Sequence, residues 1–362
     1  MLKEDLLSVN DYSEKKILQI KKSGLPVVIW GLGGMISFIV KNFQDYGVKI
    51  DYIIENNISK CGGKFNNIDI ISFQDLKLKL TDCNILIGVV TKKYVSEIKK
   101  QIKDDGQFTN VYFFEMFYPF GNTAKNRVFD NLKKIQTVID MLDDEESKVI
   151  FEKKIHYMLS KSEGVLAQIQ DFEDNQYFDK RLIDLSYKDG VFLDGGAFHG
   201  ENTIEMYKRF PNTLLHSVCI DADSENIKYM KTRTKELNNS EILYAALSSK
   251  NGIVHFVNSG DRGGMVSNDE EGNIISAIGI DDTFSDKKIA FIKLDIEGYE
   301  LECIIGAENI IKRDKPILAI CIYHSIEDHW DIPLLIKKIC PSYKLYVRHY
   351  HYMGIETVLY AI

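Results

Sequence analysis

Short apolar runs alternate with segments of helical spacing in the first part of the chain. The runs have strand length and cover residues 27–30, 48–54, 85–90 and 111–114. Residues 1–23 precede them and predict a helix, with apolar positions such as Ile17 and Ile20. Because alternating strands and helices favour a parallel sheet, we predict a small Rossmann-like α/β domain over residues 1–115.

The middle of the chain has long stretches of helical spacing. Apolar residues recur there at Val128, Leu132, Ile135, Val138 and Leu142. The acidic run DDEE at 143–146 is expected to break or cap a helix, and otherwise to form a solvated face. We predict a helical connector over residues 116–188.

Apolar runs of strand length again alternate with helical segments in the C-terminal half. The predicted strands cover residues 191–194, 217–221, 242–247, 289–295, 317–323, 343–348 and 356–361. The last two are separated by too few residues for a parallel crossover, so they must pair antiparallel. A parallel α/β sheet closed by an antiparallel hairpin is what a seven-stranded class I methyltransferase domain needs. We therefore predict that Rossmann-like fold over residues 189–362.

Composition narrows the class of protein. The 362 residues suggest about two domains. A net charge of -8 argues against nucleic acid or an anionic membrane surface as the main partner. No apolar run reaches the ~20 residues of a membrane span, and the charged N-terminal sequence lacks a signal-peptide core, so we expect a cytoplasmic protein. The six scattered cysteines fit reduced thiols, and the sequence leaves oligomerisation open.

A first glycine loop, WGLGG at 30–34, follows the first predicted strand. Gly31 and Gly33 form a G-x-G, Ile36 stands where a third glycine is expected, and Glu55 follows the next strand. The helix after the loop has no acid in its first turn, so its dipole would favour a phosphate. The loop thus predicts either a nucleotide or nucleotide-sugar site or a glycine turn in a purely structural domain.

A second glycine loop, FLDGGAFHGENT at 192–203, carries two acids. Asp194 ends the strand and Glu201 lies in the first helical turn, where both would repel a pyrophosphate. They suit a cationic, phosphate-free ligand such as S-adenosylmethionine. Small residues let the methionyl part lie close to the backbone; they are Gly195, Gly196, Ala197 and Gly200.

Asp221 ends the next predicted strand. A carboxylate there can accept hydrogen bonds from both ribose hydroxyls. Ala246 and Leu247 end the third strand and could border the adenine. The alternative is an NAD site with an unusual loop.

Five segments in this order resemble the FkbM-type S-adenosylmethionine-dependent methyltransferases over residues 175–362. They are LDGGAFHGENT (193–203), CIDADSENI (219–227), ALSSKNGIVHF (246–256), GIDDTF (279–284) and FIKLDIEGYELECIIGA (291–307). The resemblance implies an O-methyltransferase, with acceptors that include polyketide and sugar hydroxyls. It also implies that Asp194, Gly196, Gly200 and Asp221 hold the cofactor, and that Asp295 lies beside the reacting methyl.

The predicted cofactor-binding set draws on these segments. It consists of Asp194, Gly195, Gly196, Phe198, Gly200, Asn202, Thr203, Asp221, Ala222, Leu247 and Asp295. Phe198 stands where the class-wide loop D-x-G-x-G-x-G has its middle glycine. The N-terminal part, through IWGLGG and IIENN, is similar to the small α/β domain of some nucleotide-sugar acyltransferases and sugar methyltransferases.

The segment FIKLDIEGYE ends a strand in a group of acids. We predict Asp295, Glu297 and His324 as catalytic, with a structural role for each as the alternative; Glu300 is expected to stabilise the start of a helix. The spacing gives no support for a divalent ion at Asp295, Glu297 and His324, so we predict no metal site. The loop at 259–267, with Arg262, is interpreted as a lid or acceptor-binding loop, or else as a hairpin connection.

We therefore expect methyl transfer from S-adenosylmethionine to an oxygen of a small or carrier-linked sugar acceptor. One alternative is an NAD-dependent oxidoreductase, or a nucleotide-sugar-modifying enzyme, that uses Gly31 and Gly33. The other is a binding or scaffold protein with inert pockets.

Overall fold

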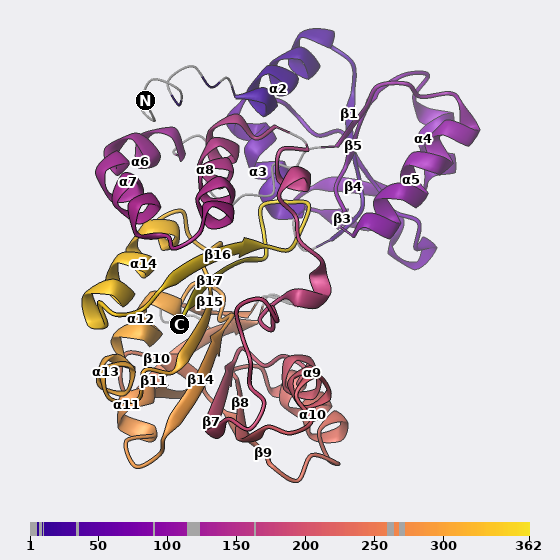
Figure 1. Cartoon of the computed structure of the whole chain (residues 1–362). Coiled ribbons are helices and arrows are strands. Elements are labelled where there is room, and N and C mark those ends of the chain that lie inside the picture. Colours follow the sequence, from indigo (N-terminus) through magenta and orange to yellow (C-terminus); the bar gives the residue numbers. More distant parts are fainter. Residues whose placement is uncertain are drawn as a thin grey trace. The chain divides into compact units, whose positions relative to one another are not determined.

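The computed structural model describes residues 6, 9, 11–33, 36–89, 91–113, 124–162, 164–258, 264–267 and 272–362. These residues form two compact units (Figure 1). The N-terminal unit holds the described residues up to 113 together with 156–164. The C-terminal unit holds residues 124–155 and 165–362.

The N-terminal unit is built on a six-stranded sheet in the order β3-β4-β2-β1-β5-β6. Its strands are β1 (Val27–Trp30), β2 (Tyr52–Ile54), β3 (Lys64–Phe65), β4 (Ile68–Ile71), β5 (Asn84–Ile87) and β6 (Val111–Phe113). All neighbours pair in parallel except β3 and β4. The predicted parallel sheet is confirmed, but the short β3–β4 hairpin was missed because β3 has too few residues to show a pattern.

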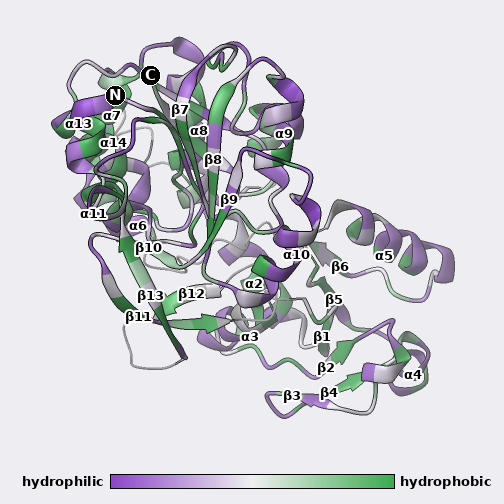
Figure 2. Ribbon diagram, turned by 90° about the horizontal axis from the view of Figure 1, so that it is seen from below, coloured by the Kyte–Doolittle hydropathy of each residue, from purple (hydrophilic) through white to green (hydrophobic). Residues whose placement is uncertain are grey.

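Amphipathic helices complete the N-terminal unit. They are α2 (Tyr12–Ser23), α3 (Ile36–Asp45), α4 (Phe73–Lys79) and α5 (Lys92–Asp105), with a short 3₁₀ turn at Ile58–Lys60. Figure 2 shows polar and apolar residues interleaved along α5. Trp30 packs on Phe73 in the buried core, with ring centroids 4.5 Å apart. Ser72 begins α4 with a capping box that includes Asp75, which explains where this helix starts.

The C-terminal unit is built on a seven-stranded sheet in the order β16-β17-β15-β14-β7-β8-β9. Its strands are β7 (Asp189–Gly195), β8 (Leu214–Asp221), β9 (Ser240–Tyr244), β14 (Ile289–Leu294), β15 (Ile317–Cys321), β16 (Leu345–His349) and β17 (Thr357–Ala361). The first five pair in parallel, and β17 pairs antiparallel with both β15 and β16. The predicted class I methyltransferase-like sheet and its terminal hairpin are confirmed.

Helices flank this sheet. They are α6 (Ala124–Asp130), α7 (Leu132–Met141), α8 (Glu145–Ser160), α9 (Glu201–Arg209), α10 (Ser224–Arg233), α11 (Ile280–Thr283), α12 (Glu300–Ile305), α13 (Glu308–Asp314) and α14 (Asp328–Ile339), with 3₁₀ turns at Leu166–Gln168 and Glu173–Asn175. The sheet core includes the stacked rings of Phe192 and Phe291. Among the helices that the structure describes, none is both long enough and apolar enough to cross a membrane.

The DDEE run corrects one expectation. Asp144 does cap the start of α8, because its side chain accepts from the Ser147 N–H at 2.7 Å. It also lies 2.7 Å from the buried guanidinium of Arg348, and Glu146 lies 3.2 Å from the same group. The run is therefore not simply a solvated face, since two of its acids pair with a cation on β16.

A smaller sheet packs beside the large one in the order β10-β13-β11-β12. Its strands are β10 (Ala246–Ser248), β11 (Gly252–Asn258), β12 (Gly264–Ser267) and β13 (Asn273–Gly279). The single strand predicted for residues 242–247 is wrong, because β9 ends at Tyr244 in the large sheet and β10 begins at Ala246 and pairs with β13 of the smaller sheet. The hairpin interpretation of 259–267 is confirmed for β12, which pairs with β11; residues 259–263, with Arg262, lie outside the described residues.

Candidate active site

A cavity of about 270 Å³ lies at the carboxyl ends of β7, β8 and β14, where doubly wound sheets bind their ligands. The smaller sheet contributes Phe256 and Val266 to its wall. The predicted site residues that line it are Gly196, Phe198, Asn202, Asp221, Ala222, Leu247, Asp295 and Glu297. The fold thus brings together residues from four separate segments that the sequence had singled out.

The loop after β7 approaches the end of β14 so closely that position 196 requires glycine. Gly196 has a φ of +68°, and a Cβ atom there would lie 1.8 Å from the Asp295 carbonyl oxygen. The Asp295 N–H in turn donates to the Gly195 carbonyl at 3.2 Å. The glycine loop and the acidic segment therefore form one wall and cannot move independently.

Asp194 does not line the cavity. This corrects the expectation that its carboxylate faces the bound ligand. The side chain is fully buried, and its Oδ2 accepts a hydrogen bond from the Thr203 hydroxyl at 2.8 Å. Its Oδ1 lies 3.3 Å from Nζ of Lys293, which is also fully buried. Asp194 therefore supports the loop from beneath, with its charge offset by a lysine that the sequence reasoning overlooked.

Lys293 joins the two walls. Its ammonium donates to the carbonyls of Gly195 and Gly196 at 3.0 and 2.8 Å. Burial opposes its charge, but Asp194 and Asp295 raise the pKa of Lys293 above its ordinary value. A charged lysine at the centre of the site thus ties the glycine loop to β14.

Three further predicted cofactor residues also lie away from the cavity wall. Gly195, Gly200 and Thr203 are absent from the residues that line it, because the turn of the loop places them behind Gly196 and Phe198. Glu201 does reach the wall, but its carboxylate lies 2.7 Å from Arg233. The negative charge expected from Glu201 is therefore partly offset.

Asp221 ends β8 at the cavity, and most hydrogen-bond acceptor sites of its carboxylate are already occupied. Its Oδ2 accepts from the Phe198 N–H, and its Oδ1 accepts from the Asp223 N–H and the Asn226 amide. Burial raises the pKa of Asp221, and these hydrogen bonds oppose that rise. A carboxylate has about four lone-pair sites, so Asp221 has room for about one ribose hydroxyl rather than two.

Four residues other than glycine line the cavity in the left-handed backbone region. They are Tyr177, Phe198, Glu297 and Glu356, with φ between +48° and +63°. Such residues cost roughly 1–3 kcal/mol each and gather at functional sites, where the surroundings hold them in place. Their concentration around one cavity supports its assignment as the candidate active site.

Each carboxylate oxygen of Asp295 accepts a hydrogen bond from a tyrosine hydroxyl. The Tyr177 hydroxyl donates to its Oδ2 at 2.9 Å, and the Tyr323 hydroxyl donates to its Oδ1 at 3.2 Å. Burial opposes its charge, but Lys293 and His324 hold the pKa of Asp295 below its ordinary value. Asp295 therefore presents a fixed carboxylate to the cavity.

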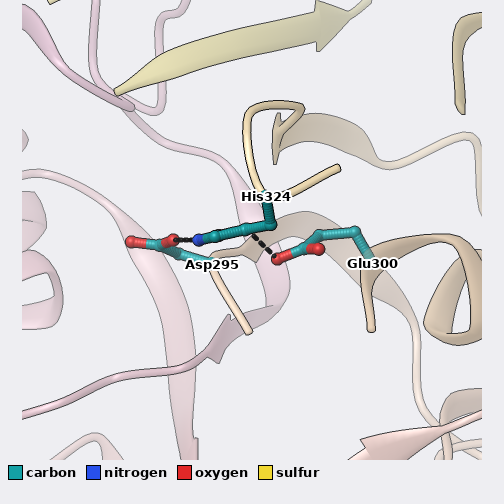
Figure 3. Close-up of side chains that lie close together, drawn as sticks. All are labelled: Asp295, Glu300 and His324. Carbon is teal, nitrogen blue, oxygen red and sulfur yellow. Dashed lines mark ion pairs between the residues drawn. The ribbon is translucent and has the colours of Figure 1, made fainter. Parts of the chain in front are cut away.

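His324 lies between the carboxylates of Asp295 and Glu300 (Figure 3) and is not among the residues that line the cavity. Its Nδ1 is 2.9 Å from Glu300, and its Nε2 is 3.5 Å from both Asp295 and Glu297. Burial opposes protonation, but these three carboxylates raise the pKa of His324 to about 10. At this pKa it is an imidazolium near neutral pH, and its predicted catalytic role stays a prediction.

Glu300 and Glu297 have different surroundings. Glu300, the first residue of α12, is fully buried and accepts from the N–H groups of Ile296 and Gly298, so it holds the turn that leads into the helix. Glu297 lines the cavity, and burial, opposed in part by His324, raises its pKa to about 7. Glu297 can therefore take up a proton near neutral pH.

Three side chains here could also hold a cation. Ligand atoms of Asp295, Glu300 and His324 lie within 4.8 Å of one another. However, Glu300 already accepts two backbone hydrogen bonds. The absence of a metal stays a prediction.

Sequence reasoning missed several residues that build the site. Lys293 was detectable as a charged residue inside the apolar run FIKL. Gln176, Tyr177, Tyr323 and Glu356 line the cavity from outside the glycine loop and the acidic segment. No local pattern identifies those four, because only the folded chain brings them to the cavity.

The first glycine loop is described only in part. Gly31 has a φ of +115°, and α3 begins at Ile36 with no acid in its first turn, as expected. The Glu55 carboxylate accepts from the Asn57 N–H at 3.0 Å, which gives it a local structural role. A nucleotide at Gly31 and Gly33 stays a prediction.

The comparisons with known proteins agree with this geometry. Residues 201–345 match the model of the methyltransferase FkbM domain. A crystal structure of methyltransferase FkbM from Methylobacillus flagellatus KT matches 100% of this chain and 99% of its own, with 19% sequence identity and a TM-score of 0.74. That likeness shows the fold of the whole chain. No curated protein matches the sequence significantly.

Two further structures resemble about half of the chain. A precorrin-6y C5,15-methyltransferase from Geobacter metallireducens GS-15 covers 48% of this chain and 80% of its own, with 14% identity and a TM-score of 0.29. The fibrillarin of Aeropyrum pernix, with natively bound S-adenosyl-L-methionine, covers 50% and 69%, with 7% identity and a TM-score of 0.31. Similarity at this level supports no further statement.

Proposed function

We propose that the chain is a methyltransferase that transfers a methyl group from S-adenosylmethionine to a hydroxyl oxygen, and the match of residues 201–345 to the model of the methyltransferase FkbM domain supports this. The acceptor in this proposal is a sugar, a glycan or a related small molecule. The observation that carries the proposal is the acidic cavity at the ends of β7, β8 and β14. A cytoplasmic location belongs to the same proposal.

The charge of the cavity favours this donor over a dinucleotide. The acids that line it are Glu201, Asp221, Asp223, Asp295, Glu297 and Glu356. Among the lining residues that the structure describes, there is no lysine or arginine. A pyrophosphate would meet repulsion there, whereas a sulfonium and an amino group would be attracted. An NAD-dependent oxidoreductase at this cavity is therefore disfavoured.

We place the nucleoside end of the donor against Asp221, Ala222 and Leu247. Asp221 has capacity for about one ribose hydroxyl, and Leu247 and Phe256 offer apolar surface for the adenine. Phe198, which donates its N–H to Asp221, keeps this carboxylate in position. The methionyl end would then run past Gly196 toward Asp295.

In this proposal the donor supplies the methyl group, and the chain aligns the reactants and accepts a proton. S-adenosylmethionine, when bound, supplies an electrophilic methyl, whose bond to sulfur breaks with both electrons going to sulfur as the new carbon–oxygen bond forms. Glu297 is the carboxylate placed to accept the acceptor's hydroxyl proton, because both oxygens of Asp295 already accept tyrosine hydroxyls. A positioned base contributes about 10²–10⁴-fold, and alignment of the two reactants contributes up to ~7–11 kcal/mol.

Isothermal titration calorimetry with S-adenosylhomocysteine tests the proposal. The wild type should bind, and Asp221→Ala should bind roughly 10- to 150-fold more weakly, because one hydrogen bond to a charged group is lost. Asp189→Ala makes the same change at the exposed start of β7 and should bind like the wild type. Thermal unfolding of each variant separates lost binding from lost structure. No heat from the wild type, or equal affinity for Asp221→Ala, would reject the proposal.

The N-terminal unit enters the proposal separately. We propose that a nucleotide or nucleotide-sugar binds at Gly31 and Gly33, where α3 offers its N-terminal dipole with no acid in the first turn. Binding of a uridine diphosphate sugar to Gly31→Ala should be weaker than to the wild type.

A further inference from the structure

The cavity continues beyond the reacting end along the edge of the large sheet. The strand order runs β8-β7-β14-β15-β17, so the ends of these strands follow one another. Asp221 ends β8, Asp295 follows β14, Tyr323 follows β15, and Glu356 directly precedes the antiparallel β17. Because the donor is placed from β8 to β14, the portion at β15 and β17 remains for the acceptor.

Two segments from distant parts of the sequence meet at this end of the cavity. Gln176 donates its amide N–H to the Glu356 carboxylate. Next to Gln176, the Tyr177 hydroxyl donates to Asp295, which joins this end to the reacting centre. Tyr177 and Glu356 both have left-handed backbones, with φ of +63° and +59°. The chain thus holds two strained residues in place to shape this portion of the wall.

The groups at this end suit hydroxyl-bearing ligands. Gln176 keeps a second amide N–H and its carbonyl, the hydroxyls of Tyr177 and Tyr323 donate to Asp295 and can still accept, and Glu356 is an acceptor. Burial and the nearby Asp295 raise the pKa of Glu356 to about 7, so this carboxyl can both donate and accept near neutral pH. A phosphate or carboxylate at the same place would face Glu356 and Asp295, whose charge Lys293 and His324 offset in part, with no lysine or arginine among the described lining residues.

We propose that Gln176 and Glu356 form an acceptor subsite, which binds hydroxyls of an uncharged sugar ring next to the oxygen that is methylated and excludes phosphorylated rings. Both residues lie outside the matched domain at 201–345, so acceptor choice depends on parts of the chain that flank it. The inference rests on the proposed function, because it assumes that the donor occupies the β8 end.

Saturation-transfer NMR on the full chain loaded with S-adenosylhomocysteine tests the subsite. The probes are methyl β-D-glucopyranoside and D-glucose 6-phosphate. We expect transfer to the uncharged sugar and little to the phosphate. Glu356→Gln and Gln176→Ala should each bind the uncharged sugar roughly threefold to tenfold more weakly, which corresponds to the loss of one hydrogen bond. Glu308→Gln, on an exposed part of α13, is the matched control and should behave like the wild type.

The results separate this inference from the proposed function. Failure of S-adenosylhomocysteine to bind would reject the proposed function. With that ligand bound, equal or stronger binding of the phosphate would overturn the subsite, and so would no binding of either sugar. The subsite is also overturned if both variants bind the uncharged sugar like Glu308→Gln. Retained affinity of each variant for S-adenosylhomocysteine shows that its fold is intact.

Discussion

Replacing Lys293 by methionine should strongly destabilise the C-terminal unit. Methionine has a similar length but leaves the buried Asp194 carboxylate without its cation, which now lies 3.3 Å away. The carbonyls of Gly195 and Gly196 also lose their donor. Removing one member of a buried ion pair costs about 3–5 kcal/mol, a large share of a typical stability of about 5–15 kcal/mol.

Urea unfolding followed by circular dichroism measures this loss, and two further variants sharpen it. Lys288→Met removes a lysine from an exposed pair with Asp189 and should cost about 0–1 kcal/mol. The double variant Lys293→Met/Asp194→Asn no longer buries an unpaired charge, so it should be less destabilised than the sum of the two single variants by about 0.5–3 kcal/mol. If Lys293→Met costs no more than Lys288→Met, or if the two single losses simply add, the reasoning about Lys293 is refuted.

Two other predictions concern the loop and pH. Gly196→Ala places a Cβ atom 1.8 Å from the Asp295 carbonyl oxygen, so calorimetry should show loss of S-adenosylhomocysteine binding. Gly252→Ala is the control and should bind normally, because no atom lies within 4 Å of the added Cβ. If both variants bind within twofold of the wild type, the close approach at Gly196 is contradicted. Burial, and then the charge of Lys154, hold the pKa values of His329 and His349 well below the ordinary value. Unfolding lets each of these histidines take up a proton, so its contribution to stability is full above about pH 6.5 and falls below it by up to about 1.4 kcal/mol per pH unit. Glu297 and Glu356, with pKa values raised to about 7, act in the opposite direction, because the folded state binds their protons more readily than the unfolded state. Urea unfolding between pH 7.5 and 5 should therefore show that the wild type loses stability relative to His349→Asn as the pH falls, and a difference that stays constant with pH would contradict this.

The large sheet could be predicted because its evidence is local. Each strand is an apolar run, and the short connection between residues 348 and 356 forces the last two strands to be antiparallel. The small sheet could not be predicted in the same way. Residues 242–247 read as one run, but the chain changes sheets at Ala245, because Ala246 and Leu247 pair with β13, which is distant in the sequence.

The candidate site was predictable where an acid ends a strand, as with Asp221 and Asp295. It was not predictable which acids face the cavity, because Asp194 has the same local pattern but lies on Lys293 beneath the loop. The residues that orient Asp295 come from elsewhere, with Tyr177 ahead of the whole sheet. Such contacts follow from strand order, and strand order is not visible in any short segment.

The central claim is that the acidic cavity between β8 and β14 holds a cationic methyl donor. A crystal structure of the chain with S-adenosylhomocysteine tests it most directly. The account predicts the ribose at Asp221 and the sulfur near Asp295. A ligand bound outside this cavity, or a dinucleotide with its pyrophosphate against Gly196, would contradict it.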